Sequence, residues 1–185
     1  MSDDNLHNYY RKDSYNDIVL DEDLGTPALR PKWSDTLKIT DGCHSLNVTA
    51  PRIYGGAEDC VDINNQARDI VVSSTFVPQG KFAATIKGGA GNITLIGTLW
   101  TRGSEVDVDL GNWSDQSSRK TTKVTLNLDT ADGKPVRVRV LNAEKPIVSP
   151  FAEVEYVWPH PDAWYHRIVV LGMLVLGKVG LLKYL

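Results

Sequence analysis

The sequence has little cysteine, little histidine and no excess of positive charge. Two cysteines, Cys43 and Cys60, are too few for the disulfide framework of a small secreted protein, and their different positions within the repeat described below argue against a bond between them. The four histidines share no spacing, and no metal-binding or phosphate-binding motif is present, so we expect no metal and no cofactor. A net charge of −3 gives no electrostatic reason to expect nucleic-acid binding.

A secretory leader is also missing from the beginning of the sequence. The opening MSDDNLHNYYRKDSYND contains no apolar run of the kind that such leaders need. We therefore expect synthesis in the cytoplasm. The 185 residues, of which 42% are hydrophobic and 23% charged, are enough for one domain with a core of its own.

Short segments repeat along the middle of the chain, in steps of 24 and then 23 residues. Three sets keep the same spacing, which chance would not produce. The sets are LKIT at 37, VDIN at 61 and ATIK at 84; LNV at 46, IVV at 70 and ITL at 93; and Ile53, Val77 and Trp100.

Each repeat contains strand-like runs of alternating polarity, separated by Gly, Asn or Asp turns. Runs of three or four residues are not stable alone, but equivalent runs stacked in parallel would bury one face of each. We therefore predict an all-β fold, a short parallel β-helix with about 23 residues per turn. Its internal stacks are expected to be Ile39, Ile63 and Ile86; Leu46, Ile70 and Ile93; and Val48, Val72 and Leu95.

The repeat weakens after Trp100, although alternating runs continue to residue 141. These runs predict strands of a cap or of irregular last rungs. In the last of them the valines should point inward, and Arg137 and Arg139 outward. The runs are VDVDL at 106, KVTLNL at 123 and PVRVRVL at 135.

The two ends of the chain differ in character from the repeats. Residues 1–36 predict an extended N-terminal arm that docks on a partner surface, the alternative being an arm that wraps its own domain. Residues 37–150 would form the β-helix with its last rungs or cap. Residues 151–185 would form a linker and a hydrophobic C-terminal segment.

Part of the repeat region resembles a known family. SLNVTAPRIYGGAEDCVDINNQARDIVV, followed by IKGGAGNITLIG, resembles the polygalacturonase branch of the pectin-lyase-like right-handed β-helices, over about residues 40 to 97. The resemblance implies a right-handed coil. It also implies that Asp41, Asp59 and Asp62 would be the catalytic acids if the chain were a glycosidase, since these enzymes invert a sugar centre with carboxylates on adjacent turns.

The sequence departs from the enzymes of this family in three ways. Glu58 stands where the first Asp of the family's Asp-Asp-Cys stretch should be, the supporting histidine turn is replaced by VPQGKFAATIKG, and three to five rungs are few for a sugar-binding groove. We therefore expect no catalytic residues. Asp62 is interpreted instead as one member of a solvated charge ladder with Lys38 and Thr85.

The C-terminal segment is the other informative feature. Asp162 is a suitable N-cap for a hydrophobic helix over 163–185, but Lys178 interrupts its apolar run, which is then short for a membrane span. We expect it to mediate self-association or partner docking, with a membrane anchor and packing on its own domain as alternatives. The residues of this assembly or membrane segment are Trp164, Ile168, Leu171, Gly172, Leu174, Gly177 and Leu181.

Taken with the arms, the short β-helix predicts a non-enzymatic structural protein in a large assembly, of the kind found among bacteriophage virion parts such as capsid decoration proteins, head fibres and tail-associated modules. Its partners would be copies of itself or a coat or tail protein. Three alternatives remain open: a carbohydrate-binding adhesin using Trp100 and Trp113, a membrane-anchored protein, and, last, a degenerate glycosidase.

Overall fold

The computed structural model describes residues 6–11, 17–27, 34–111 and 119–157. These residues form thirteen strands and no helix. Every pairing between strands is parallel. The prediction of an all-β fold is therefore confirmed for this part of the chain.

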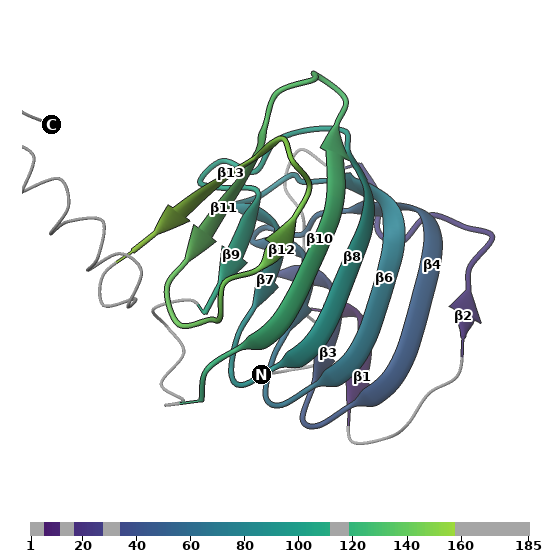
Figure 1. Cartoon of the computed structure of the whole chain (residues 1–185). Coiled ribbons are helices and arrows are strands. Elements are labelled where there is room, and N and C mark those ends of the chain that lie inside the picture. The colour runs from purple at the N-terminus through teal and green to yellow at the C-terminus, as the bar shows by residue number, and fades with distance from the viewer. Residues whose placement is uncertain (1–5, 12–16, 28–33, 112–118, 158–185) are drawn as a thin grey trace, which may run out of the picture.

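The strands form two sheets, and successive strands along the chain lie alternately in one sheet and in the other (Figure 1). Sheet A has the order β1 (Leu6–Arg11), β3 (Asp35–Thr40), β5 (Asp59–Ile63), β7 (Phe82–Ile86), β9 (Val108–Leu110), β11 (Val136–Val140) and β13 (Ala152–Tyr156). Sheet B has the order β2 (Ile18–Val19), β4 (His44–Tyr54), β6 (Arg68–Val77), β8 (Gly91–Leu99), β10 (Thr122–Thr130) and β12 (Ile147–Val148). We call a strand of sheet A and the following strand of sheet B a rung.

The core lies between the two sheets and consists of stacked aliphatic side chains. Ile39 pairs with Ile63 and Ile63 with Ile86, as the repeat predicts, and the other two predicted stacks are also confirmed by the register of sheet B. All of these side chains are buried. Full burial of one such side chain stabilises the fold by about 1.5–3 kcal/mol, so the stacks are the main source of stability.

The third predicted set is wrong, because Ile53 does not align with Val77 and Trp100. Ile53 pairs with Phe76, and Phe76 pairs with Leu99. A register shift within β4 changes the step between β4 and β6 from 24 to 23 residues before this point, so the spacing of 24 no longer applies. Trp100 lies one residue beyond β8 and is 65% exposed.

The turns between the strands also repeat. Two consecutive residues with positive φ follow each of β3, β5 and β7, and they are Asp41–Gly42, Asn65–Gln66 and Gly88–Gly89. Gly, Asn and Asp tolerate this backbone region best, which explains why the sequence places them there. The amide of Asn65 donates a hydrogen bond to the carboxylate of Asp41 on the rung before it (3.2 Å).

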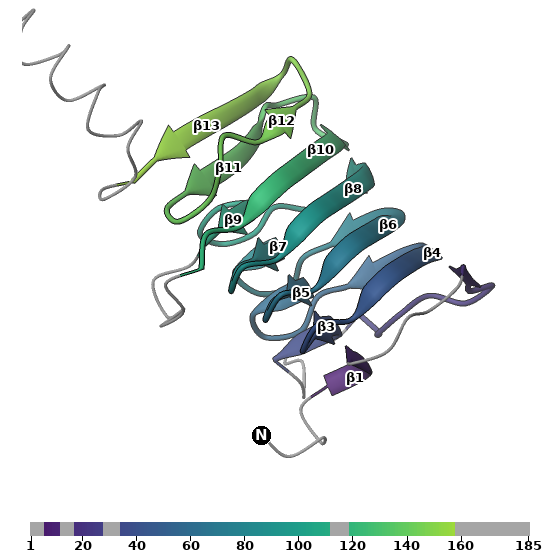
Figure 2. The same ribbon diagram turned by 60° about the horizontal axis from the view of Figure 1, so that its bottom comes forward.

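The last rungs extend the same two sheets and do not form a separate cap. β9 pairs with β7 and with β11, and β10 pairs with β8. Figure 2 shows the strands following one another from the β1 end of the stack to the β13 end. The valines of β11 are buried while Arg137 and Arg139 lie on the outer face, as predicted.

The described parts of the N-terminal arm belong to the same stack. β1 pairs with β3, and β2 pairs with β4. Leu24 is buried, and its backbone amide donates to the carbonyl of Arg52 (2.9 Å). These segments therefore lie on the protein's own sheets, as in the alternative in which the arm wraps its own domain.

Candidate functional site

The outer face of sheet A carries a buried group of charged side chains, which we call the acid cluster. It consists of Asp35, Asp59 and Asp62 together with Lys38 and Lys87. The register places Asp35 beside Asp59, and Lys38 beside Asp62. Because Leu37, Ile39 and Ile63 of the same strands point into the core, alternation turns the side chains of Lys38 and Asp62 outward.

Asp62 is the centre of the acid cluster. Its two carboxylate oxygens lie 2.7 Å from Nζ of Lys38 and 3.4 Å from Nζ of Lys87, and one of them also accepts a hydrogen bond from Asn64 (2.8 Å). Lys38 also contacts Asp35 at 3.4 Å. Asp62 is only 1% exposed, so its interpretation as a member of a solvated ladder is wrong. The alignment with Lys38 and Thr85 is confirmed.

Two carboxyl groups of the acid cluster hold their protons more tightly than exposed ones do. Burial, followed by the negative charge of Asp62, raises the pKa of Asp35 from 3.8 to about 6. Burial, followed by the charges of Asp62 and Asp35, also raises the pKa of Asp59 well above 3.8. Burial is thus the main cause of both raised pKa values, and the repulsion between the three carboxyl groups adds to it.

Three oxygen atoms of the acid cluster and its neighbour Thr85 are buried without a well-formed hydrogen bond among the described residues. They are Oδ1 of Asp59, the Thr85 hydroxyl that lies near it, and Oδ1 of Asp62, whose contact with Nζ of Lys87 is 3.4 Å long. Buried polar atoms of this kind are usually satisfied by a bound water molecule. No group of three or more acidic, histidine or cysteine side chains suited to a metal ion is found in the described part of the chain.

The structure brings together two of the three acids that the family resemblance implies. Asp59 and Asp62 belong to the acid cluster, whereas Asp41 lies in the turn beyond β3. Its expected place is taken by Asp35, which sequence reasoning missed. Asp35 lies 24 residues before Asp59, so extending the repeat backwards by two residues from LKIT would have identified it.

A second charged network closes the far end of the same face. Asp107 is fully buried and accepts hydrogen bonds from Arg102 (2.7 Å) and from Nη2 of Arg137 (2.9 Å). Burial alone would raise the pKa of Asp107, but hydrogen bonds from the side chain and backbone of Arg137 and from Arg102 lower it. Asp109 receives two parallel hydrogen bonds from Arg139, both 2.9 Å long.

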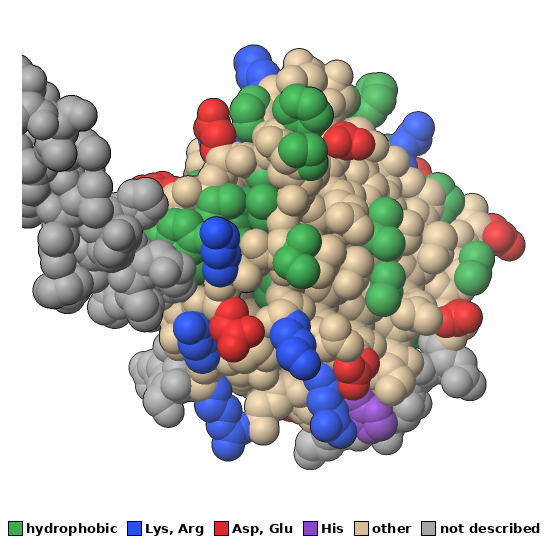
Figure 3. Space-filling model, in the orientation of Figure 1, with side chains coloured by type: hydrophobic (Ala, Val, Ile, Leu, Met, Phe, Trp, Pro, Cys, Tyr) green, Lys and Arg blue, Asp and Glu red, His purple; other side chains and the backbone are tan. Residues whose placement is uncertain are grey.

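The end of the stack formed by β12 and β13 is less well covered than its centre, and we call it the open end. Ile147 and Phe151 are 68% and 74% exposed. Hydrophobic side chains gather on the side of the molecule where β12 and β13 lie (Figure 3). β12 has only two residues and pairs with Thr125 and Leu126 in the middle of β10, so no described strand pairs with the end of β10 on that side.

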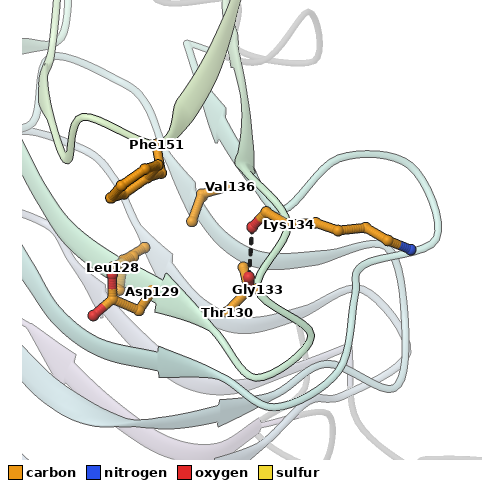
Figure 4. A pocket seen from close by; sticks show the side chains of 7 residues that line it. All are labelled: Leu128, Asp129, Thr130, Gly133, Lys134, Val136 and Phe151. Carbon is orange, nitrogen blue, oxygen red and sulfur yellow. Dashed lines mark hydrogen bonds between the residues drawn. The ribbon is translucent and has the colours of Figure 1, made fainter.

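A cavity of about 280 Å³ lies where β12 stops short. Phe151, Leu128 and Val136 turn apolar surface toward it, and the turn after β10 closes one side (Figure 4). Thr130 holds that turn by donating a hydrogen bond to the carbonyl of Lys134. The open end therefore combines exposed apolar side chains with a hollow that can accept a side chain from another protein.

Several residues that the sequence nominates lie outside the described residues. These are Trp113 and the C-terminal set Trp164, Ile168, Leu171, Gly172, Leu174, Gly177 and Leu181. Within the described ranges, no helix is long and apolar enough to cross a membrane. Cys43 and Cys60 are both buried and form no disulfide bond with each other, as their positions in the repeat predict.

Comparison with known proteins adds no relative. No protein-family model, no curated protein and no solved structure matches the chain. The resemblance to the pectin-lyase-like family therefore stays a prediction, and the functional argument depends on the geometry of the chain itself.

Proposed function

We propose that this protein is a non-enzymatic structural subunit of a large protein assembly, attached to its neighbours through the open end. In this proposal the stack is a short right-handed parallel β-helix that serves as a rigid spacer. The assembly is of the virion type, such as a capsid decoration, head-fibre or tail-associated module, and the partner is another copy of the chain or a coat or tail protein.

The observation that carries the proposal is the contrast between the centre of the stack and its open end. Side chains in the central rungs are buried on the inner face of both sheets and on the outer face of sheet A. At the open end, Ile147 and Phe151 remain exposed, and Phe151 lines a cavity together with Leu128 and Val136. Large exposed side chains next to a hollow are typical of surfaces that bind another protein.

The acid cluster supports a structural role more than a catalytic one. An inverting glycosidase keeps two carboxyl groups about 6.5–9.5 Å apart, with room for water and a sugar between them. Here Asp35, Asp59 and Asp62 are each at most 5% exposed, and Asp62 contacts two lysines. Carboxyl groups so placed tie neighbouring rungs together and give a sugar chain little access.

Light scattering on the full chain tests the proposal. We expect the protein to form an oligomer whose mass grows with concentration, and Ile147→Ser/Phe151→Ser to shift it toward the monomer. Both side chains are largely exposed, so the melting temperature of the double variant should change little. Val19→Ser is the matched control, because it removes an apolar side chain that is 70% exposed at the opposite end of sheet B.

Two results would contradict the proposal. One is a protein that stays monomeric at every concentration. The other is a double variant that associates as strongly as the unaltered chain, which would place the contact elsewhere.

A further inference from the structure

The last strand of sheet A pairs with one described strand only and carries two exposed acids. β13 pairs with β11 through Ala152–Tyr156 and with no other described strand. Its sequence alternates, so Val154 is half-buried against the core while Glu153 and Glu155 are exposed on the outer face. A strand at the edge of a sheet offers backbone groups to which a further strand can pair.

The charges of Glu153 and Glu155 are only partly balanced by the strand beside them, since Glu155 attracts Arg139 without forming an ion pair with it. The register puts Glu153 beside Arg137 and Glu155 beside Arg139. Both arginines already bind other carboxylates. Arg137 donates at least two hydrogen bonds to Asp107, and Arg139 donates two to Asp109. Neither glutamate forms an ion pair within the described residues.

A groove of about 340 Å³ runs along this part of the outer face. Three of its side chains are glutamates, namely Glu105, Glu153 and Glu155. Among the described residues that line it, Arg137 is the only basic one, and it is paired with Asp107. Glu105 lies 3.6 Å from Arg139, so Glu153 and Glu155 are the two acids of the groove that form no ion pair with a described residue. The groove and the edge of β13 therefore form one negative surface, which we call the acidic edge.

We propose that the acidic edge binds a β-strand of a partner protein in which apolar residues alternate with Lys or Arg. This inference rests on the proposed assembly function and names the chemistry of the segment that docks. The backbone of such a strand would pair with β13, its apolar side chains would continue the row of Val138 and Val154, and its basic side chains would meet Glu153 and Glu155.

The protein itself already contains one pairing of this kind. β9 presents Asp109 on the outer face, and β11, with the sequence VRVRV, adds beside it with valines inward and arginines outward. β13 presents the same alternation as β9, with Glu in the outer positions. A second basic strand would thus repeat on β13 a contact that the fold makes on β9.

A peptide with the sequence of residues 134–142, KPVRVRVLN, is a suitable probe. Labelled with fluorescein, it would be titrated with the full-length protein and followed by fluorescence anisotropy. The matched peptide carries Arg137→Glu and Arg139→Glu. The protein variants are Glu153→Gln/Glu155→Gln and, as a charge-matched control, Asp21→Asn/Glu22→Gln, whose acids are exposed near β2 at the opposite end of sheet B.

We expect the basic peptide to bind about tenfold more tightly than the acidic one. Its affinity should fall about tenfold for the Glu153→Gln/Glu155→Gln protein and should decrease as the salt concentration rises. The control variant should bind as the unaltered protein does. Equal binding of both peptides, or an equal loss in the control, overturns the inference. Absence of binding by either peptide also overturns it, because the acidic edge then does not accept a basic strand.

These results can be separated from those on the proposed function. If Ile147→Ser/Phe151→Ser breaks up the oligomer but the peptides show no charge preference, the assembly role stands and the basic strand is wrong. If the basic peptide binds selectively to a protein that stays monomeric, the acidic edge stands and self-association is wrong.

Discussion

Replacing Asp35 by asparagine should make the free energy of unfolding less sensitive to rising pH. Asp35 lies in the acid cluster and is only 5% exposed. It contacts Lys38, and the negative charge of Asp62 raises its pKa. Asparagine has nearly the same shape as the protonated acid and does not ionise. The substitution therefore removes the ionisation step while keeping most of the packing.

The size of the effect follows from the pKa of Asp35, which is about 6 in the folded protein against 3.8 in an exposed chain. Because the folded state holds this proton more tightly, the free energy of unfolding falls as pH rises from about 3.8 to about 6, and changes no further above that. A difference of about two pKa units corresponds to roughly 3 kcal/mol. The free energy of unfolding of Asp35→Asn, relative to the unaltered protein, should rise by this amount between pH 4 and pH 7.5.

Urea unfolding at a series of pH values measures this difference directly. Asp132→Asn is the control. Hydrogen bonds from Arg102 hold the pKa of the exposed Asp132 at about 2, so it is ionised in the folded protein by pH 4 and, with an ordinary pKa of 3.8, in the unfolded chain by about pH 5. Its stability difference from the unaltered protein should stay flat from about pH 5 to about pH 7.5. A flat difference for Asp35→Asn as well would mean that Asp35 ionises normally and that the acid cluster is not buried as described.

Three further predictions concern single positions. In urea unfolding, Gly97→Ala should lower the free energy of unfolding by more than about 3 kcal/mol, because the new Cβ would lie 1.8 Å from a backbone oxygen of the neighbouring strand. Gly133→Ala has open space around it and should cost only about 1 kcal/mol, because of its φ of 69°. Equal losses for the two variants would refute the packing of β8 on β6. Asp107→Ala should lower the free energy of unfolding by about 3 kcal/mol, because it leaves two arginines without their buried partner. A change below about 0.5 kcal/mol in thermal or urea unfolding would mean that this network does not hold the last rungs. Cys43 and Cys60 are fully buried, and burial raises the pKa of Cys60. A thiol reagent should therefore react with them only after unfolding, and rapid labelling of the native protein would contradict their position in the core.

The internal stacks could be predicted from the sequence because the parallel register copies the repeat spacing directly. Ile39, Ile63 and Ile86 keep the same position in each repeat and meet in space. The set that begins with Ile53 failed because a single register shift in β4 is not visible in the spacing. A repeat therefore predicts neighbours well until the first irregularity.

The acid cluster could be predicted only in part. Alternation shows that Asp62 and Lys38 point away from the core, but it does not show whether the outer face is covered. Both side chains are buried, which changes a weak surface pair into a group with raised carboxyl pKa values. The pairing of Arg137 with Asp107 joins residues 30 apart, outside the 23-residue spacing, so the repeat gave no sign of it.

The open end could not be located from the sequence. β12 and β13 lie in a region where the spacing between paired residues falls to 16, from Val138 to Val154. Neither the shortness of β12 nor the exposure of Phe151 follows from composition, because both depend on where the last chain crossing between the sheets runs.

Hydrogen exchange of the full chain at low and high protein concentration tests the central claim, that other subunits dock at the open end. The account predicts that amides within residues 147–156 exchange more slowly as concentration rises. Amides of β6, in the middle of the stack, should show no change. Slower exchange at β6 or at β2 with none at 147–156, or no dependence on concentration anywhere in the described strands, would contradict it.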